Sequence, residues 1–276
     1  MRRGFFGIAI ATILTTSAMA ADLPVKAPPI PPVVYDWTGF YIGLNLGYSW
    51  GRSSDVSTLT NFPLGLPYFI NTDHSRMDGV LGGAQAGYNW QVTNWVLGIE
   101  EDLDGTGERA KRSFTCPTGV CSPPTLVPII GAGVLVVPGV AVPFSMSQRL
   151  DWFSTIRGRV GYLVTPRVLL YGTAGFAFGQ VSTSETVAGS PFGFTSSDTR
   201  YGWTAGAGIE GIIAPNWTAR LEYLYLDLGT TSGSFLTGIP ANPVGVLSSN
   251  FSSHITDNIL RVGVNYTFNT PIVAKY

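Results

Sequence analysis

The sequence predicts an all-β chain, a transmembrane antiparallel up-and-down β-barrel of eight strands with short periplasmic turns and long extracellular loops. Three observations predict this fold. Large apolar residues alternate with small or polar ones along several stretches, which is the period of a β-strand. Only 12% of the residues are charged, about half the usual share, whereas 12% are aromatic. After the N-terminal segment, no uninterrupted apolar run is long enough for a spanning helix.

The N-terminal segment has the features of an export signal. Arg2 and Arg3 precede an apolar run, and Ala18 and Ala20 are the small residues expected before a cleavage site. We therefore expect a signal peptide over residues 1–20. The proline density of residues 21–35 then predicts an extended periplasmic leader, and residues 36–276 form the outer-membrane barrel domain.

The first expected strand, within residues 36–51, indicates which environment surrounds each face of the sheet. Phe40, Ile42 and Leu44 lie on one face, and Gly43 and Asn45 lie on the other. A soluble barrel would turn its large residues inward and its charges outward. Here the charges of the later strands fall on the glycine face, so we predict that the bulky face meets lipid and the small face lines a narrow lumen.

The same alternation predicts seven more strands, and the connections between them set the topology. The connections at 91–94, 165–167 and 214–216 are short, and aromatic residues near the strand ends suit two interfacial girdles. Closure of the barrel leaves no sheet edge in hydrocarbon. The further strands are expected at residues 79–90, 95–103, 150–164, 167–181, 201–213, 217–228 and 258–268. The long loops are expected at roughly 51–78, 104–148, 182–200 and 229–257. The girdle candidates are Trp37, Trp50, Trp90, Trp95, Trp217 and Phe268.

Charged residues on the inward face predict a salt-bridge stack inside the barrel, because charges buried in a low dielectric must be paired. The expected members are Glu100, Asp102, Arg157, Arg159, Glu210, Arg220, Glu222 and Arg261. Depth along the strands suggests the pairs Asp102–Arg157, Glu210–Arg220 and Glu222–Arg261. A gated ion path through the stack is the functional alternative. Glu101 has lipid-facing parity, and we expect it near the outer interface or turned inward by a bulge.

Outside the lumen, the sequence contains few candidates for chemistry. No catalytic, cofactor or metal site is expected, although His74 beside Ser75 and His254 after Ser253 leave a lipid hydrolase at the barrel rim as an alternative. Cys116 and Cys121 are candidates for a loop disulfide in the oxidising periplasm, with two free thiols as the alternative.

The nearly uncharged segment 125–144 predicts an apolar contact surface for lipopolysaccharide, another barrel or a host surface, or else a lid over the barrel mouth. The net charge of -1 gives no sign of nucleic-acid binding.

Several motifs resemble one family closely. "ADLPVKAPP", "WTGFYIGLNLGYSWG", "GIEEDL", "STIRGRVGYLV", "PNWTARLEYLYLDLG" and "RVGVNYTF" are similar to the small porin-like, immunogenic outer-membrane surface proteins of alphaproteobacteria, which have an OmpA-type eight-stranded barrel. The resemblance covers nearly all of the mature chain outside the long loops. Two features depart from it, the long apolar loop and the tail after Phe268, which leaves either Phe268 or Tyr276 as the end of the insertion signal.

The resemblance implies an abundant protein of a Gram-negative outer membrane that supports envelope integrity. Its implied partners are outer-membrane lipid and lipopolysaccharide, the barrel-assembly machinery during insertion, and host or envelope proteins through the extracellular loops. Some relatives have been linked to pore activity or haem binding, so a narrow channel or a haem-binding surface receptor is the alternative. Neither has a motif here that can be carried over residue by residue.

Overall fold

The computed structural model describes residues 35–62, 67–118, 125–129, 133–137, 139, 141–187, 193–238 and 246–268. The expected signal peptide, nearly all of the leader and Tyr276 lie outside these residues. Within them no helix is long and apolar enough to cross a membrane. The described strands are β1 (Gly39–Phe62), β2 (Pro67–Val92), β3 (Trp95–Thr106), β4 (Arg109–Cys116), β5 (Thr125–Ile129), β6 (Gly133–Val137), β7 (Val142–Thr165), β8 (Val168–Val187), β9 (Gly193–Ala214), β10 (Trp217–Gly238) and β11 (Val246–Thr267).

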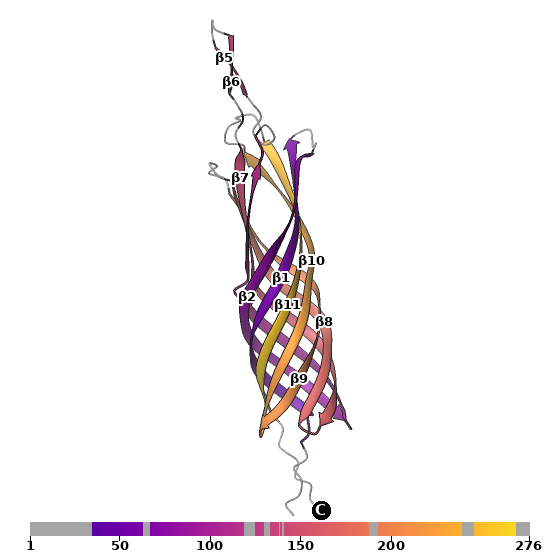
Figure 1. The fold of residues 1–276 in the computed structure, drawn as a ribbon. Coiled ribbons are helices and arrows are strands. Elements are labelled where there is room, and N and C mark those ends of the chain that lie inside the picture. The colour runs from indigo at the N-terminus through magenta and orange to yellow at the C-terminus, as the bar shows by residue number, and fades with distance from the viewer. Residues whose placement is uncertain are drawn as a thin grey trace, which may run out of the picture. The chain divides into compact units, whose positions relative to one another are not determined.

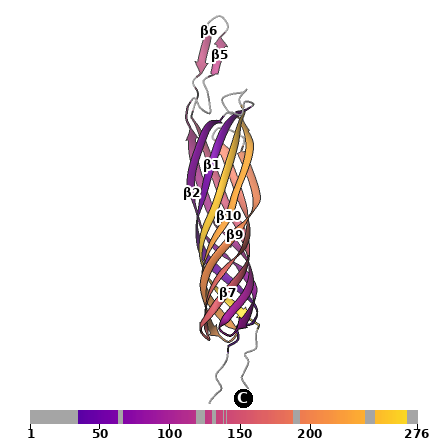
Figure 2. The same cartoon turned by 90° about the vertical axis from the view of Figure 1, so that its right-hand side faces the viewer.

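Eight strand paths close into a ring. The order is β1-β11-β10-β9-β8-β7-β3-β2, and β2 pairs again with β1. All of these pairings are antiparallel, and β4 continues the path of β3 along β7 after a break at Gly107 and Glu108. Figures 1 and 2 show the strands tilted and wound around a common axis. The predicted up-and-down barrel of eight strands is therefore confirmed, with no open edge across the bilayer.

The turns at one end are as short as predicted. Two-residue turns join β2 to β3, β7 to β8 and β9 to β10. Thr93 and Asn216 occupy them with positive φ angles of 55° and 65°. Asn tolerates this left-handed conformation well, and the Asn216 side chain also donates to the Thr267 carbonyl at 2.8 Å. These turns mark the periplasmic end of the barrel.

The segments that were expected to be long loops are mostly strand. β1 pairs with β11 as far as Phe62 and Val246, and β7 pairs with β8 as far as Phe144 and Val187. The loop expectation was wrong because these segments are rich in Ser and Thr on both faces. Above the bilayer neither face needs apolar side chains, so the contrast that marks a lipid-facing strand disappears while the backbone ladder continues.

Above the bilayer the ring divides into two half-sheets. The β2–β4 pairing is a single pair, Asp78 with Arg109, and the β9–β10 pairing ends at Trp203 and Asp227. Beyond these points β2, β1, β11 and β10 stay paired in one half-sheet, and β4, β7, β8 and β9 stay paired in the other.

The outward face carries the apolar band that the sequence predicts. Leu44 and Leu46 on β1 are 64% and 66% exposed, whereas Arg157 on the inward face is 1% exposed. Aromatic pairs mark both edges of the band. At the turn end these are Trp95–Tyr162, Trp217–Tyr266, Tyr88–Trp90 and Phe40–Phe268, and at the other end Trp50–Tyr223, Trp152–Phe178 and Trp203–Tyr225. The assignment of lipid-facing and lumen-facing sides is therefore correct.

Trp37 does not belong to the girdle in which it was expected. It is 4% exposed and packs with Val96, Leu163 and Leu169 inside the periplasmic end of the barrel. Its indole N–H donates to the carbonyl of Pro166 at 3.3 Å, and its backbone N–H donates to the side chain of Gln91 at 2.9 Å. Trp37 precedes the first strand, so strand parity could not assign its side.

The apolar segment 125–144 divides between two structures. β5 and β6 form a two-stranded sheet of their own, which is not hydrogen-bonded to the barrel sheet, and Val134 and Val136 are exposed on it. Phe144, at the end of the segment, belongs to β7, where it is buried and stacks on Phe114 with a centroid distance of 4.9 Å.

Candidate functional site

All eight inward charges predicted from the sequence lie in the lumen. They are at most 3% exposed, and they come from β3, β7, β9, β10 and β11. Asp104, at the far end of β3, joins them and is fully buried. Four arginines therefore face five carboxylates in one continuous cluster, which we call the lumen network.

Arg157 and Arg261 form the centre of the network. Arg157 contacts Glu100, Asp102 at 2.7 Å and Glu222 at 3.1 Å. Arg261 contacts Asp102 at 2.6 Å, Glu222 at 2.7 Å and Asp104 at 2.9 Å. Each guanidinium thus bridges acids from different strands, and its planar donor fork suits this better than the point charge of a lysine would.

Two of the three predicted pairs form, and one does not. Asp102–Arg157 and Glu222–Arg261 are both present. Arg220 lies directly opposite Glu210 in the strand register, yet its guanidinium reaches across the lumen to Glu100, while Glu210 accepts from Arg159 at 2.6 Å. In a barrel this narrow, an arginine side chain spans the lumen, so its partner need not be on a neighbouring strand.

Two tyrosines add hydrogen bonds and a ring contact to the lumen network. The hydroxyl of Tyr41 donates to Glu100 at 2.6 Å, and that of Tyr171 donates to Glu222 at 3.1 Å. The guanidinium carbon of Arg159 lies 4.1 Å from the centre of the Tyr171 ring. Sequence reasoning missed these tyrosines, although both occupy inward positions of strands it had placed.

Glu210 also accepts hydrogen bonds from uncharged side chains. The Asn265 amide donates to it at 2.8 Å, and the hydroxyl of Thr218 donates at 2.6 Å. Gln85 donates in turn to Asn265 at 2.8 Å and accepts from Asn45 at 2.9 Å. The buried carboxylates thus accept from neutral as well as charged donors, as buried ions require.

Apolar clusters lie at both ends of the lumen network. Trp37, Val96, Leu163, Leu169 and Tyr171 fill the periplasmic end. Towards the outside, β2, β4, β7, β8, β10 and β11 together supply a second cluster. Its members are Met77, Leu81, Ala110, Leu150, Phe153, Ala177, Val181, Leu224, Leu226, Leu228, Ile255 and Ile259. Side chains therefore pack the lumen above and below the charges.

A second buried polar group lies above the outer apolar cluster, between the two half-sheets. The hydroxyl oxygen of Ser53 lies 2.9 Å from an oxygen of Asp55 and 2.9 Å from one of Gln148, and Arg112 lies 3.4 Å from Asp55. Arg200 donates to the carbonyl of Ser253 at 3.2 Å. This group was missed because its members fall in segments that were interpreted as loops.

The Ser/His combination considered for a hydrolase is not assembled. Ser253 is fully buried between the half-sheets, whereas the adjacent His254 faces outward, with its Nδ1 3.0 Å from Thr230 and its Nε2 3.6 Å from Asp227. Neighbouring residues of a strand point to opposite faces. A catalytic Ser253–His254 pair would therefore require a loop at this position, whereas both residues belong to β11. His74 lies with its Nδ1 3.0 Å from the Ser54 hydroxyl on the paired strand β1.

The remaining sequence candidates are only partly described. Cys116 is buried at the end of β4, and Cys121 lies outside the described residues, so their disulfide stays a prediction. Among the residues that the structure does describe, no group of three or more His, Cys, Asp or Glu side chains could hold a metal ion.

Two known proteins are similar to this chain in sequence over most of its length. The 31 kDa outer-membrane immunogenic protein of Brucella melitensis is 36% identical over 94% of this chain and 97% of its own length. The 22 kDa outer membrane protein of Rhizobium leguminosarum is 30% identical over 82% of this chain and 80% of its own length. Both relatives are named as outer-membrane proteins, and neither is named as an enzyme.

Solved structures of outer-membrane proteins match this chain at low sequence identity. OprG from Pseudomonas aeruginosa is 14% identical, with a TM-score of 0.43, and the match covers 86% of this chain and all of that one. The outer membrane protease OmpT from Escherichia coli is 12% identical, also with a TM-score of 0.43, over 83% of this chain and 97% of that one.

The family comparison spans most of the sequence. The model of the outer membrane protein beta-barrel domain matches residues 7–268, a range that contains every strand described above. Together with the two relatives, this match places the protein in the outer membrane of a Gram-negative cell. The chain belongs to the outer membrane protein beta-barrel domain family.

Proposed function

We propose that this outer-membrane surface protein has a structural role, strengthening the envelope and presenting surface contacts, and that it neither conducts ions nor catalyses a reaction. The observation that carries the proposal is the lumen network between two apolar clusters. An ion crossing the barrel would have to separate buried ion pairs and also displace packed Leu, Ile and Phe side chains. Both steps would raise the free-energy barrier to ion passage, and the lumen of a conducting pore presents no such barrier.

The outer half-sheets support the proposed surface role. Strands such as β1 and β11 remain paired well beyond the outer aromatic girdle, so rigid structure extends outside the bilayer. Exposed valines on β5–β6 offer an apolar surface for lipopolysaccharide, a neighbouring barrel or a host protein. The Brucella melitensis relative is named as an immunogenic protein, which agrees with a surface that is accessible from outside.

The decisive experiment combines folding and conductance. The purified protein is refolded into lipid vesicles, and the faster migration of unheated samples on a gel establishes that the barrel has formed. Planar-bilayer recordings of the same preparation are then expected to be silent. Discrete channel openings from folded protein, altered in an Arg157→Ala variant, would establish the narrow channel instead.

The envelope role requires a test in cells. A deletion strain is expected to become more sensitive to detergents that the outer membrane normally excludes, and the wild-type gene should restore resistance. An Arg149→Ala gene serves as a control, because among the described residues this exposed arginine forms an ion pair only with Asp151 on the surface, so the variant should restore resistance equally well. Unchanged sensitivity of the deletion strain would contradict the envelope role.

A further inference from the structure

Glu101 is a charged side chain in the lipid-facing band. It lies directly opposite Ala86 on β2 and Ile156 on β7, and its side chain is exposed. Along the strands that the structure describes, no other Asp, Glu, Lys or Arg faces outward between the two aromatic girdles. No bulge turns Glu101 inward, since the β3 register is continuous through it.

The depth of Glu101 differs from the sequence expectation. The turn-end girdle includes Trp95, six residues earlier on β3, and the outer girdle includes Trp152, which pairs with Gly105 four residues later. Glu101 therefore lies well inside the apolar band rather than at the outer interface. Hydrocarbon offers a carboxyl group no hydrogen-bond partner, and within the described residues Glu101 makes no hydrogen bond or ion pair.

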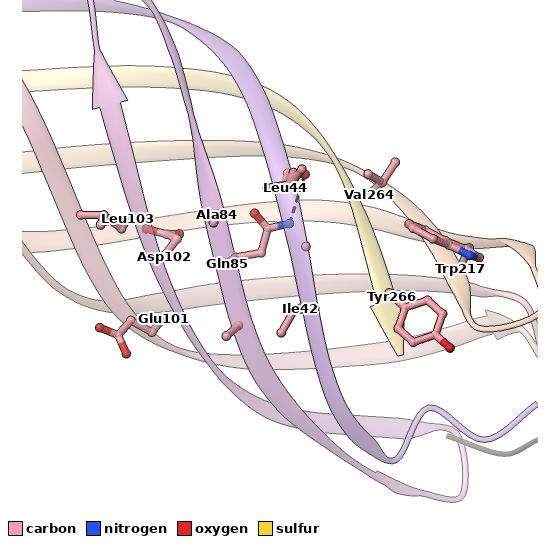
Figure 3. A pocket seen from close by; sticks show the side chains of 12 residues that line it. Ile42, Leu44, Ala84, Gln85, Glu101, Asp102, Leu103, Trp217, Val264 and Tyr266 are labelled. Atoms are coloured by element: carbon pink, nitrogen blue, oxygen red, sulfur yellow. Dashed lines mark hydrogen bonds between the residues drawn. The ribbon is translucent and has the colours of Figure 1, made fainter. Parts of the chain in front are cut away.

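A hollow in the barrel surface begins beside Glu101. Its volume is about 600 Å³, and Ala84 and Ala86, the small outward residues of β2, are among the residues that line it. Figure 3 shows the hollow with Glu101 and Leu103 at one side and Trp217 and Tyr266 at the other, and the Glu101 and Asp102 side chains point in different directions. Larger side chains on β1 and β3 stand on either side of the alanines.

We propose that this surface, formed by Glu101 and the β2 hollow, is the interface of a homodimer, with a second copy of the chain as its occupant. Both copies insert with the same polarity, so a twofold axis between them must run along the membrane normal. An axis that passes beside Glu101 brings the two Glu101 side chains together at equal depth. The O–H of one carboxyl group then donates a hydrogen bond to an oxygen of the other, which supplies the partner that lipid cannot.

The shape of the surface agrees with this symmetry. Rotation by 180° about an axis between β2 and β3 places β3 of each copy opposite β2 of the other. Leu103, which lies at the level of Ala84, would thus enter the alanine hollow of the partner barrel. Small residues that allow close backbone approach are typical of contacts within membranes, where burial of apolar surface alone gives little driving force.

Native mass spectrometry in mild detergent, supported by cross-linking in lipid vesicles, tests the proposal on the full-length mature protein. The wild type is expected to give a mass of two chains. Glu101→Leu removes the shared hydrogen bond and Ala86→Phe fills the hollow, and each should weaken dimerisation roughly tenfold or more. Glu101→Gln retains hydrogen-bonding capacity, so its dimer should persist.

Ala174→Phe is the matched control, because Ala174 is an exposed, lipid-facing alanine on β8, away from the hollow. Its dimer should match the wild type. Gel migration of unheated samples establishes that every variant is folded. A monomeric wild type, or a dimer that persists unchanged in both Glu101→Leu and Ala86→Phe, would overturn the proposal. The presence or absence of ion conductance does not bear on the homodimer proposal. The homodimer proposal can therefore fail independently of the proposed envelope role.

Discussion

At the scale of single residues, the environment of Arg157 strongly limits what can replace it. Its side chain is fully buried and contacts carboxylates on β3 and β10 simultaneously, namely Glu100, Asp102 and Glu222. A buried ion pair contributes little net stability, but removing one partner leaves the others charged and unpaired in a low dielectric. The charged Arg157 side chain is therefore compatible with the buried lumen only when its carboxylate partners are also present.

We expect Arg157→Ala to lower the free energy of unfolding by about 3–5 kcal/mol, the usual cost of breaking a buried pair. Urea titration in lipid vesicles, followed by gel migration, measures this change. Arg149→Ala removes a surface pair whose arginine side chain is 48% exposed, so its effect should stay below about 1 kcal/mol. Similar losses in the two variants would show that the lumen network does not depend on Arg157.

Glycines on the inward face make room for these large side chains. A Cβ atom at Gly83 would lie 2.0 Å from the carbonyl oxygen of Leu103, and one at Gly175 would lie 2.0 Å from that of Ile156. At Gly82, which faces outward on the same strand as Gly83, the nearest atoms would be 3.4 Å away. The glycine-rich face seen in the sequence thus reflects close strand approach in a small barrel as well as the volume of the arginines.

At the scale of the elements, the strands above the bilayer carry a titratable group that is distinct from the lumen network. Glu185 on β8 is 5% exposed and lies between Met146 on β7 and Phe194 on β9 in the register. Burial raises the pKa of its carboxyl to about 7, and the charge of Arg112 only partly opposes this. Near neutral pH the Glu185 carboxyl therefore titrates inside a packed half-sheet.

We expect the outer half-sheet that contains β8 to become less stable as the pH rises from about 4.5 to about 7. An unfolded chain loses the Glu185 proton near the ordinary pKa, whereas the folded chain holds it to higher pH, so ionisation works against folding in this window. The resulting loss in the stability of the half-sheet can reach about 3 kcal/mol. Hydrogen exchange of the β8 amides at pH 5 and pH 7.5 measures it.

Glu185→Gln should remove most of this pH dependence, because the amide does not ionise. Asp198→Asn is the control, since Asp198 is an exposed acid on the neighbouring strand β9 and its replacement should leave the dependence in place. An unchanged pH profile in Glu185→Gln would mean that another group controls the stability of the half-sheet.

At the scale of the whole molecule, a closed barrel requires the pairing between β1 and β11. Their register runs unbroken from Tyr41 and Thr267 to Phe62 and Val246. At its periplasmic end the N–H of Phe268 donates to the carbonyl of Phe40 at 3.0 Å, and the two rings lie 5.6 Å apart. Phe268 therefore extends the closing ladder by one residue and anchors it in the aromatic girdle.

We expect Phe268→Ala to slow barrel formation and to cost about 1–2 kcal/mol, because it removes aromatic packing at the point of closure. The rate at which the fast-migrating form appears after dilution into lipid vesicles measures the effect. Tyr276→Ala, in the tail beyond the described residues, should fold at the wild-type rate. Slow folding of Tyr276→Ala together with wild-type folding of Phe268→Ala would instead assign the end of the insertion signal to Tyr276.

Strand parity along the chain was sufficient to predict much of the barrel. Lipid and lumen impose opposite demands on neighbouring residues, so the alternation alone assigns the eight membrane strands, the short turns and all eight inward charges. It could not assign the outer strands, because water on the outside and a polar interior both accept Ser and Thr. Asp104 was missed because the expected strand ended at Leu103, whereas β3 continues to Thr106.

The sequence by itself determined which residues face lipid and which face the lumen, because a period of two depends only on neighbours along the chain. Only the tertiary structure decided which charges meet, since Arg220 reaches Glu100 across the barrel instead of the neighbouring Glu210. It also decided the depth of Glu101 and the side of Trp37. These depend on register, tilt and closure, which arise only when all of the strands are joined.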